Sequence, residues 1–248
     1  MTKKTTDCNP EEGKQVNTEG FNGFHYTEAG KSERVMNTAI EIPVTIILNG
    51  EDLVTLLASP DHLDMLAAGY LLSEGFLKDK DDLAKIVVDS AHGIVRVDTR
   101  ETGEQDSSRI YKRIITSGCG RGTSFYSSAD SSSKRVQSST TISPEMVYEM
   151  AKQFQHMSKL YLETHGVHSA GLYDKADLLI FHEDIGRHNA IDKIVGQCLI
   201  DGIDTAGKIV VTSGRVTSDI LYKISKVISP SSSLYRHPPI WQCGWQKT

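Results

Sequence analysis

One cysteine in this sequence lies in a segment whose composition favours reactivity. Glycines at positions 118, 120 and 122 surround Cys119, and Arg121 lies two residues further along the chain. Glycine neighbours leave the sulfur sterically open and allow the loop to move. A nearby cation lowers the pKa of a thiol from its ordinary value of about 8.5, which favours the nucleophilic thiolate. The segment predicts a reactive cysteine, and the alternative is a tight turn around an inert one.

The other three cysteines do not share this setting. Cys198 lies beside Leu199 in an expected helix, where a small buried thiol in the core is the favoured interpretation. Cys8 and Cys243 lie near the two ends of the chain. No two cysteines form a CxxC pair, so neither a disulfide framework nor a cysteine-rich structural zinc site is expected.

A second group of polar residues follows two expected strands. The segment 182–189, His-Glu-Asp-Ile-Gly-Arg-His-Asn, comes directly after a strand that ends at Phe181, and Ser-Gly-Arg at 213–215 follows one that ends at Thr212. Ligands of open parallel sheets bind beyond the carboxyl ends of the strands. If the two strands are neighbours, both loops line one crevice, where helix N-termini and the guanidinium groups of Arg187 and Arg215 suit a phosphate group.

Other interpretations of these residues stay open. Glu183 and Asp184 could cap the following helix, and Arg187 could pair with either carboxylate. A metal site is conceivable, although the spacing of the histidines and the glutamate matches no familiar ligand pattern. A histidine at position 168, among small residues, could contact a ligand or be a satisfied core residue. The candidate binding residues are Arg187, Ser213, Gly214, Arg215, His168, His182, Glu183, Asp184 and His188.

Strands and a helix are expected in the first half of the chain. Asn49-Gly50 lies between two β-rich runs and is a strong hairpin signal. Ser59-Pro60 then predicts the N-cap and first residue of an amphipathic helix. The expected strands are 44–48, 53–57, 85–89, 94–98 and 109–116.

The second half of the chain alternates strands with helices. A Ser/Thr-rich stretch at 127–141 is expected to be a mobile loop, and Ser143-Pro144 begins a helix that extends to Tyr161. Alternating strands and helices favour parallel strands in an α/β layer. The expected elements are a strand at 172–173, a strand at 177–181, a helix at 190–199, a strand at 208–212 and a helix at 217–228.

The ends of the chain differ from its middle. Residues 1–34 are polar and predict a disordered or loosely attached arm, and residues 229–248 have neither helical nor strand period, which predicts a poorly ordered tail. The α/β domain is therefore expected at 35–228. A net charge of −5 argues against a general nucleic-acid binder. With no apolar run of about 18–20 residues and no signal-peptide pattern, a cytoplasmic location is expected.

Five segments together resemble the formate dehydrogenase accessory sulfurtransferase family, FdhD. The longest, His-Glu-Asp-Ile-Gly-Arg-His-Asn-Ala-Ile-Asp-Lys at 182–193, is highly specific, and all five occur in the family's order and separation from about 43 to 226. The other four are Gly-Tyr-Leu-Leu-Ser-Glu-Gly at 69–75, Ser-Gly-Cys-Gly at 117–120, Gly-Val-His-Ser-Ala at 166–170 and Ser-Gly-Arg at 213–215.

The resemblance implies a fold and a function. The fold is a cytidine deaminase-like mixed sheet with packed helices, preceded by a small region of β-hairpin and helix. The implied function is to accept sulfur from a cysteine desulfurase as a persulfide on Cys119. That sulfur passes to the molybdenum cofactor, bis-molybdopterin guanine dinucleotide, needed by formate dehydrogenase. The resemblance also implies a homodimer and a site in which a guanine nucleotide fits.

Two features depart from the family pattern. Gly122 stands where many members have a second cysteine, so Cys119 must act without a partner thiol in that loop. Residues 229–248 do not resemble the family's C-terminal segment, which contacts the guanine nucleotide. One alternative function is a non-catalytic chaperone that binds guanine nucleotide or cofactor. The other is a zinc hydrolase of deaminase-like fold, but the H-x-E and P-C-x-x-C motifs of such enzymes are absent from the sequence.

Overall fold

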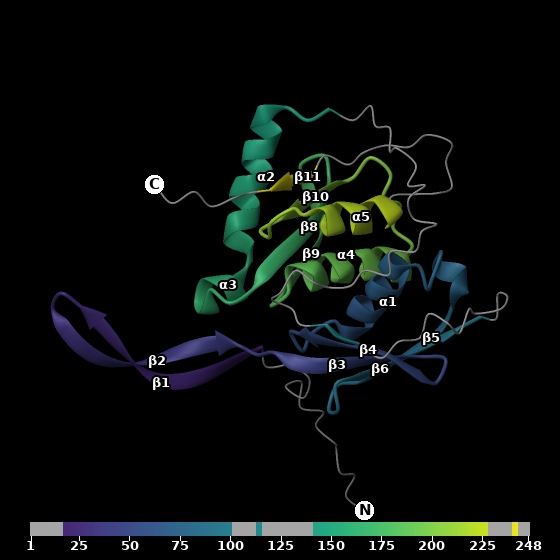
Figure 1. Cartoon of the computed structure of the whole chain (residues 1–248). Coiled ribbons are helices and arrows are strands. Elements are labelled where there is room, and N and C mark those ends of the chain that lie inside the picture. Colours follow the sequence, from purple (N-terminus) through teal and green to yellow (C-terminus); the bar gives the residue numbers. More distant parts are fainter. Residues whose placement is uncertain (1–16, 101–112, 116–140, 228–239, 243–248) are drawn as a thin grey trace, which may run out of the picture.

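The computed structural model describes residues 17–100, 113–115, 141–227 and 240–242 (Figure 1). Strands in three sheets combine with helices, so the mixed α/β class expected from the sequence is confirmed. The more detailed likeness to cytidine deaminases stays a prediction. Among the described helices, none is long and apolar enough to cross a membrane.

The first large sheet has five strands in the order β5-β6-β3-β4-β7. Asn49 and Gly50 form the tight turn between β3 and β4, with φ of 50° and 87°, as the Asn-Gly signal predicts. Alternate residues of β3 (Val44, Ile46, Leu48) are buried toward helix α1. The elements are β3 (Ile42–Leu48), β4 (Glu51–Ala58), α1 (Leu63–Glu74), η1 (Lys80–Asp82), β5 (Leu83–Asp89), β6 (Ile94–Thr99) and β7 (Arg113–Ile115).

The second large sheet has the order β11-β10-β8-β9. β9 and β10 are both antiparallel to β8, so they run in the same direction. They are not neighbours, which differs from the arrangement that the sequence analysis assumed for a shared crevice. The reason is that β8 and β9 form a hairpin, which leaves β8 beside β10. The carboxyl ends of β9 and β10 nevertheless lie at one end of the sheet. The strands are β8 (His168–Asp174), β9 (Asp177–Asp184), β10 (Ile209–Thr212) and β11 (Ile240–Gln242).

Helices cover both faces of this second sheet (Figure 1). Apolar residues of α4 (Arg187–Asp201) and α5 (Ser218–Val227) pack on one face. α2 (Pro144–Met157) packs on the other, and α3 (Lys159–Thr164) follows α2 in the chain. The single helix expected to start at Ser143-Pro144 is thus interrupted at Ser158, whose side chain caps α3 by accepting a hydrogen bond from the Tyr161 amide.

Helices α1 and α4 touch through their backbones and join the two large sheets. A Cβ atom on Gly69 would lie 1.8 Å from the carbonyl oxygen of Asp192. A Cβ atom on Gly196 would lie 1.8 Å from the carbonyl oxygen of Met65. Only glycine fits at either position, which gives a structural reason for the glycine that opens the 69–75 segment.

The ends of the chain carry strands that the sequence pattern did not reveal. β1 (Thr18–Thr27) and β2 (Gly30–Ala39) form a hairpin where a disordered or loosely attached arm was expected. The hairpin extends away from the rest of the molecule in Figure 1, and most of its side chains are exposed. Neither face is buried, so no clear apolar alternation marks its strands. In the expected tail, β11 pairs in parallel with β10.

Candidate functional site

The candidate site lies at the end of the second sheet where β9 and β10 finish. Register pairs His168, the first residue of β8, with Asp184, the last residue of β9. Ser213, just after β10, extends the pairing with β8, because its amide donates to the Ser169 carbonyl (3.0 Å) and its hydroxyl accepts from the Ser169 amide (2.9 Å). β8 therefore starts between the two loops that the sequence analysis singled out.

The two loops meet at Gly214 and Arg187. A Cβ atom on Gly214 would lie 2.7 Å from Cβ and 3.3 Å from Cδ of Arg187, so the arginine side chain runs along the glycine. The Gly214 amide donates to the hydroxyl of Thr212 (3.1 Å), which fixes the turn after β10. The 213–215 loop and the start of α4 are thus in contact at the end of the sheet where the sequence analysis expects a crevice.

Basic side chains gather at this expected crevice. Arg187 is 7% exposed, and its Nε atom has no hydrogen-bond partner among the described residues, whereas Arg215 is exposed. Burial lowers the pKa of Arg187, and the neighbouring charge of Arg215 lowers it further. Burial and both arginines also lower the pKa of His168, and burial followed by Arg187 lowers that of His188 to about 4. At neutral pH His188 is uncharged, and the two arginines make the crevice suitable for an anion.

Asp184 has a structural role and does not line the crevice. It is fully buried and pairs with the equally buried Lys193 (Nζ–Oδ2 2.8 Å). It also accepts hydrogen bonds from the Ser59 amide (3.1 Å), the Gly186 amide (2.8 Å) and the Asn189 side chain (2.8 Å). These donors satisfy a charge that would otherwise be very costly to bury. Arg187 therefore does not pair with Asp184.

Lys193 connects this carboxylate to the loop between β4 and α1. Its Nζ atom also pairs with Asp61 (2.7 Å) and donates to the carbonyl oxygen of Glu183 (3.1 Å). The Ser59 hydroxyl accepts a hydrogen bond from the Ile185 amide (3.0 Å). Ser59 is therefore not the N-cap that the sequence predicts: α1 begins at Leu63, and the capping position is occupied by residue 62.

His182 and Glu183 point to opposite faces of β9. The His182 ring, whose pKa burial lowers to about 4, bonds Gln197 (2.7 Å) and meets the His62 ring edge-on at 4.7 Å. Glu183 bonds the hydroxyls of Ser158 and Ser169 on the other face. The side chains at 182, 183 and 188 therefore do not converge as a metal site would require, and no other such group occurs in the described residues.

A second buried network ties α5 to α4 and α1. Lys223 pairs with Asp192 (3.0 Å) and with Glu74 (3.3 Å), and the hydroxyl of Ser73 donates to Asp192 (2.9 Å). The sequence analysis missed the roles of both lysines. Asp192-Lys193 is a charged pair between the apolar residues Ile191 and Ile194, but it does not by itself indicate burial, and no pattern marks Lys223. The 69–75 and 182–193 segments thus supply much of the buried scaffold beneath the crevice.

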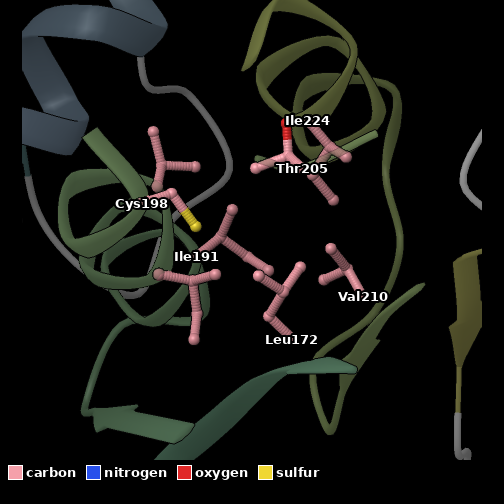
Figure 2. Close-up of a pocket in the computed structure, with 8 residues that line it drawn as sticks. Leu172, Ile191, Cys198, Thr205, Val210 and Ile224 are labelled. Carbon is pink, nitrogen blue, oxygen red and sulfur yellow. The ribbon is translucent and has the colours of Figure 1, made fainter. Parts of the chain in front are cut away.

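Among the described residues, Cys198 is buried, and its thiol is a poor nucleophile. Its thiol lines a small apolar cavity of about 20 Å³ between α4, α5 and the sheet, and Figure 2 shows it facing Ile191 and Leu172. Burial raises its pKa to about 12, so it stays protonated at neutral pH. Cys119, Arg121, Cys8 and Cys243 lie outside the described residues, as do 127–140 of the expected polar loop.

Comparison with known proteins identifies the family of this chain. The sequence model of the FdhD/NarQ family matches residues 39–231, a range that includes every described element from β3 to α5. The chain belongs to the FdhD/NarQ family. The family resemblance drawn from the five segments is thereby confirmed.

Curated relatives of this FdhD/NarQ chain are named sulfur carrier protein FdhD. The one from Bacillus subtilis is 38% identical over 81% of this chain and 77% of its own length. The one from Bacillus pumilus is 42% identical over 75% of this chain and 72% of its own. A crystal structure of a protein from Desulfotalea psychrophila, assigned as a formate dehydrogenase accessory protein, has a TM-score of 0.67 at 24% identity. The superposed region covers 86% of this chain and 80% of the Desulfotalea psychrophila chain, and the two have the same fold.

Replacing Lys193 should strongly destabilise the protein. Lys193→Met leaves Asp184 buried without its counter-charge, and breaking one side of a buried ion pair costs about 3–5 kcal/mol. The free energy of unfolding, measured in urea, should fall by that amount. Lys208→Met is the matched control, because Lys208 pairs with Asp174, which is 48% exposed. That control should lose less than about 1 kcal/mol. Equal losses in both variants would contradict the structural role of Lys193.

Glu183 should make stability depend on pH. Burial, with the charge of Asp61 second, raises its pKa from 4.5 to about 7. Between these values the folded state holds a proton that the unfolded chain releases, so stability falls as pH rises from 4.5 through 7. Glu183→Gln cannot ionise. Its stability relative to wild type should therefore rise by about 1–2 kcal/mol from pH 5 to pH 8, with allowance for solvent screening.

Urea unfolding of both proteins at pH 5, 6, 7 and 8 measures this difference. Glu149→Gln, at an exposed position of α2, serves as the control and should show the same pH dependence as wild type. A stability difference between Glu183→Gln and wild type that stays constant with pH would mean that Glu183 titrates normally.

Proposed function

We propose that this chain is a sulfur carrier that serves the maturation of a formate dehydrogenase. It accepts sulfur from a cysteine desulfurase as a persulfide on Cys119 and passes it to the molybdenum cofactor, bis-molybdopterin guanine dinucleotide. Family membership and the names of the curated relatives support the carrier role. The observation that carries the proposal is the crevice where Arg187 and Arg215 gather beside Gly214.

The charge of the crevice suits the phosphate groups of a dinucleotide cofactor. Guanidinium groups bind phosphate through paired hydrogen bonds, and helix N-termini add free backbone N–H groups and a favourable dipole. α4 begins at Arg187 and α5 at Ser218, so two helix N-termini flank the crevice. A guanine nucleotide such as GDP, which carries the same kind of diphosphate, is a practical probe of this site.

The position at which β7 ends supports a role for Cys119 near this crevice. β7 pairs in parallel with β4, and its last residue, Ile115, lies opposite Leu56. The carbonyl oxygen of the next residue, Leu57, accepts a hydrogen bond from Asn189 in α4 (2.8 Å). Three residues lie between Ile115 and Cys119, and four residue steps span at most about 14 Å. This chain length is compatible with the proposed action of Cys119 near the first turn of α4.

The loading of Cys119 that we propose needs no external oxidant or reductant. The Cys119 thiolate attacks the outer sulfur of the donor's persulfide, one S–S bond forms as another breaks, and the donor leaves as a thiolate. The role of the glycines at 118, 120 and 122 is to let this sulfur reach two large partners in turn. The homodimer expected from the family stays a prediction.

Loss of Cys119 should abolish sulfur transfer. After incubation with a cysteine desulfurase and cysteine, mass spectrometry with a persulfide-selective reagent should find added sulfur on Cys119. Cys119→Ala should carry none and should leave formate dehydrogenase inactive in cells that depend on this protein. Cys198→Ala is the control: it should lose on the order of 1 kcal/mol of stability and keep transfer, because its thiol is buried.

The same experiment separates the alternative functions. A non-catalytic chaperone would bind GDP but carry no added sulfur on any cysteine, and Cys119→Ala would remain active in cells. A zinc hydrolase would contain stoichiometric zinc, which metal analysis of the purified protein detects. Label on Cys8, Cys198 or Cys243 in place of Cys119 would overturn the assignment of the carrier residue.

Removing Arg215 should weaken nucleotide binding. Arg215 is exposed at the crevice, so Arg215→Ala removes a charge-assisted hydrogen bond at little cost to packing. Hydrogen bonds to charged groups contribute about 1.5–3 kcal/mol, so the dissociation constant for GDP in calorimetry should rise roughly tenfold or more. Arg96→Ala, at an exposed position of β6, should bind GDP like wild type. Equal affinities of all three proteins would exclude a phosphate contact by Arg215.

A further inference from the structure

The N-terminus of α5 contains a threonine that does not act as a helix cap. The carbonyl oxygen of Thr217 accepts the first hydrogen bond of the helix, from the Leu221 amide (3.0 Å), so Thr217 occupies the capping position. A threonine there normally accepts a hydrogen bond from an amide in the first turn. Its hydroxyl oxygen is instead buried without a hydrogen-bond partner among the described residues.

Two other helices of the same molecule show the usual arrangement. The Ser143 hydroxyl accepts from the Met146 amide (3.2 Å) at the start of α2, and the Ser158 hydroxyl accepts from the Tyr161 amide (2.9 Å) at the start of α3. Thr217 leaves the first-turn amides of α5 without this partner. A buried hydroxyl without a partner is costly, so its position calls for an explanation.

The second unpartnered buried group lies at the first residue of the neighbouring helix α4. Arg187 is more than nine-tenths buried, and its Nε atom finds no acceptor in the described part of the protein. A Cβ atom on Gly214, three residues before Thr217, would lie 3.3 Å from the Cδ atom of Arg187, which is bonded to Nε. The carboxylate of Asp219, in the first turn of α5, is near enough to raise the pKa of Arg187, yet accepts no hydrogen bond from its Nε atom.

We propose that the Thr217 hydroxyl, the Arg187 Nε–H group and the first-turn amides of α5 bind one phosphate group of the ligand. This inference rests on the proposed function, in which the crevice holds a phosphate-bearing nucleotide. A phosphate oxygen accepts from all three kinds of donor at once and satisfies both buried groups. The exposed Arg215 then holds the adjacent phosphate, so that the crevice recognises a diphosphate through an inner and an outer position.

A pair of variants at position 217 tests this proposal. Thr217→Val keeps the shape of the side chain and removes the hydroxyl, whereas Thr217→Ser keeps the hydroxyl. Calorimetry with GDP and with inorganic pyrophosphate should show that Thr217→Val weakens both by the same factor, roughly tenfold or more. Thr217→Ser should bind both within about threefold of wild type. Thr45→Val, which removes a hydroxyl bonded to Thr55 on the distant sheet, should leave both affinities unchanged.

The two probes separate a phosphate contact from other effects. Unchanged pyrophosphate affinity in Thr217→Val, or a loss confined to GDP, would overturn the proposal and leave the anion crevice intact. Equal weakening by Thr217→Ser and Thr217→Val would also overturn it, because the hydroxyl would then not be the binding group. If wild type binds neither probe, both this proposal and the crevice of the proposed function are wrong. Thermal unfolding of each variant identifies any loss that comes from misfolding.

Discussion

The ion pair between Lys193 and Asp184 is the interaction on which the rest of this structure depends. Both side chains are fully buried, and between them they contact the end of β9, the first turns of α4 and the loop that leads into α1. A charge in this environment is tolerable only while its partners remain in place. The pair therefore fixes the two large sheets relative to each other at the edge of the crevice. Arg187 follows Asp184 by three residues, so its position is set by the same contacts.

The alternation of side chains along β9 separates three roles within one short segment. His182 and Asp184 point toward α4 and take part in buried hydrogen bonding, whereas Glu183 points to the opposite face and meets the hydroxyls of α3 and β8. The chain then turns at Gly186 and starts α4, which directs Arg187 and His188 to the crevice. Most polar residues of the 182–188 segment therefore have a structural role. Arg187, near its C-terminal end, is the residue that the proposed function assigns to a ligand.

Sequence patterns predicted the elements well where a periodic apolar face is buried. The strands on either side of Asn49-Gly50 have such a face, and the turn itself was predicted from its residue types. The helix after Gly186 was predicted from its apolar residues, although it is buried on nearly all sides. The β1–β2 hairpin was missed because it buries neither face, and the two lysine networks were missed because nothing local indicates that Lys193 and Lys223 are buried. The insertion of β8 between β9 and β10 depends on long-range pairing, which no local signal contains. The contact between Arg187 and Gly214 agrees with the prediction that the loops after two strands meet, because ligand sites of such sheets form beyond the carboxyl ends of the strands.

The glycine contact between α1 and α4 has a consequence for how the two large sheets are held. Gly69 and Gly196 bring backbone against backbone, so the two helices can keep this close approach only while both positions lack a side chain. The contact therefore joins the two sheets through a seam that has no room for a side chain at either glycine. In the proposed function, the end of the second sheet that carries Arg187 would then serve as a fixed reference point for the partners that deliver and receive sulfur.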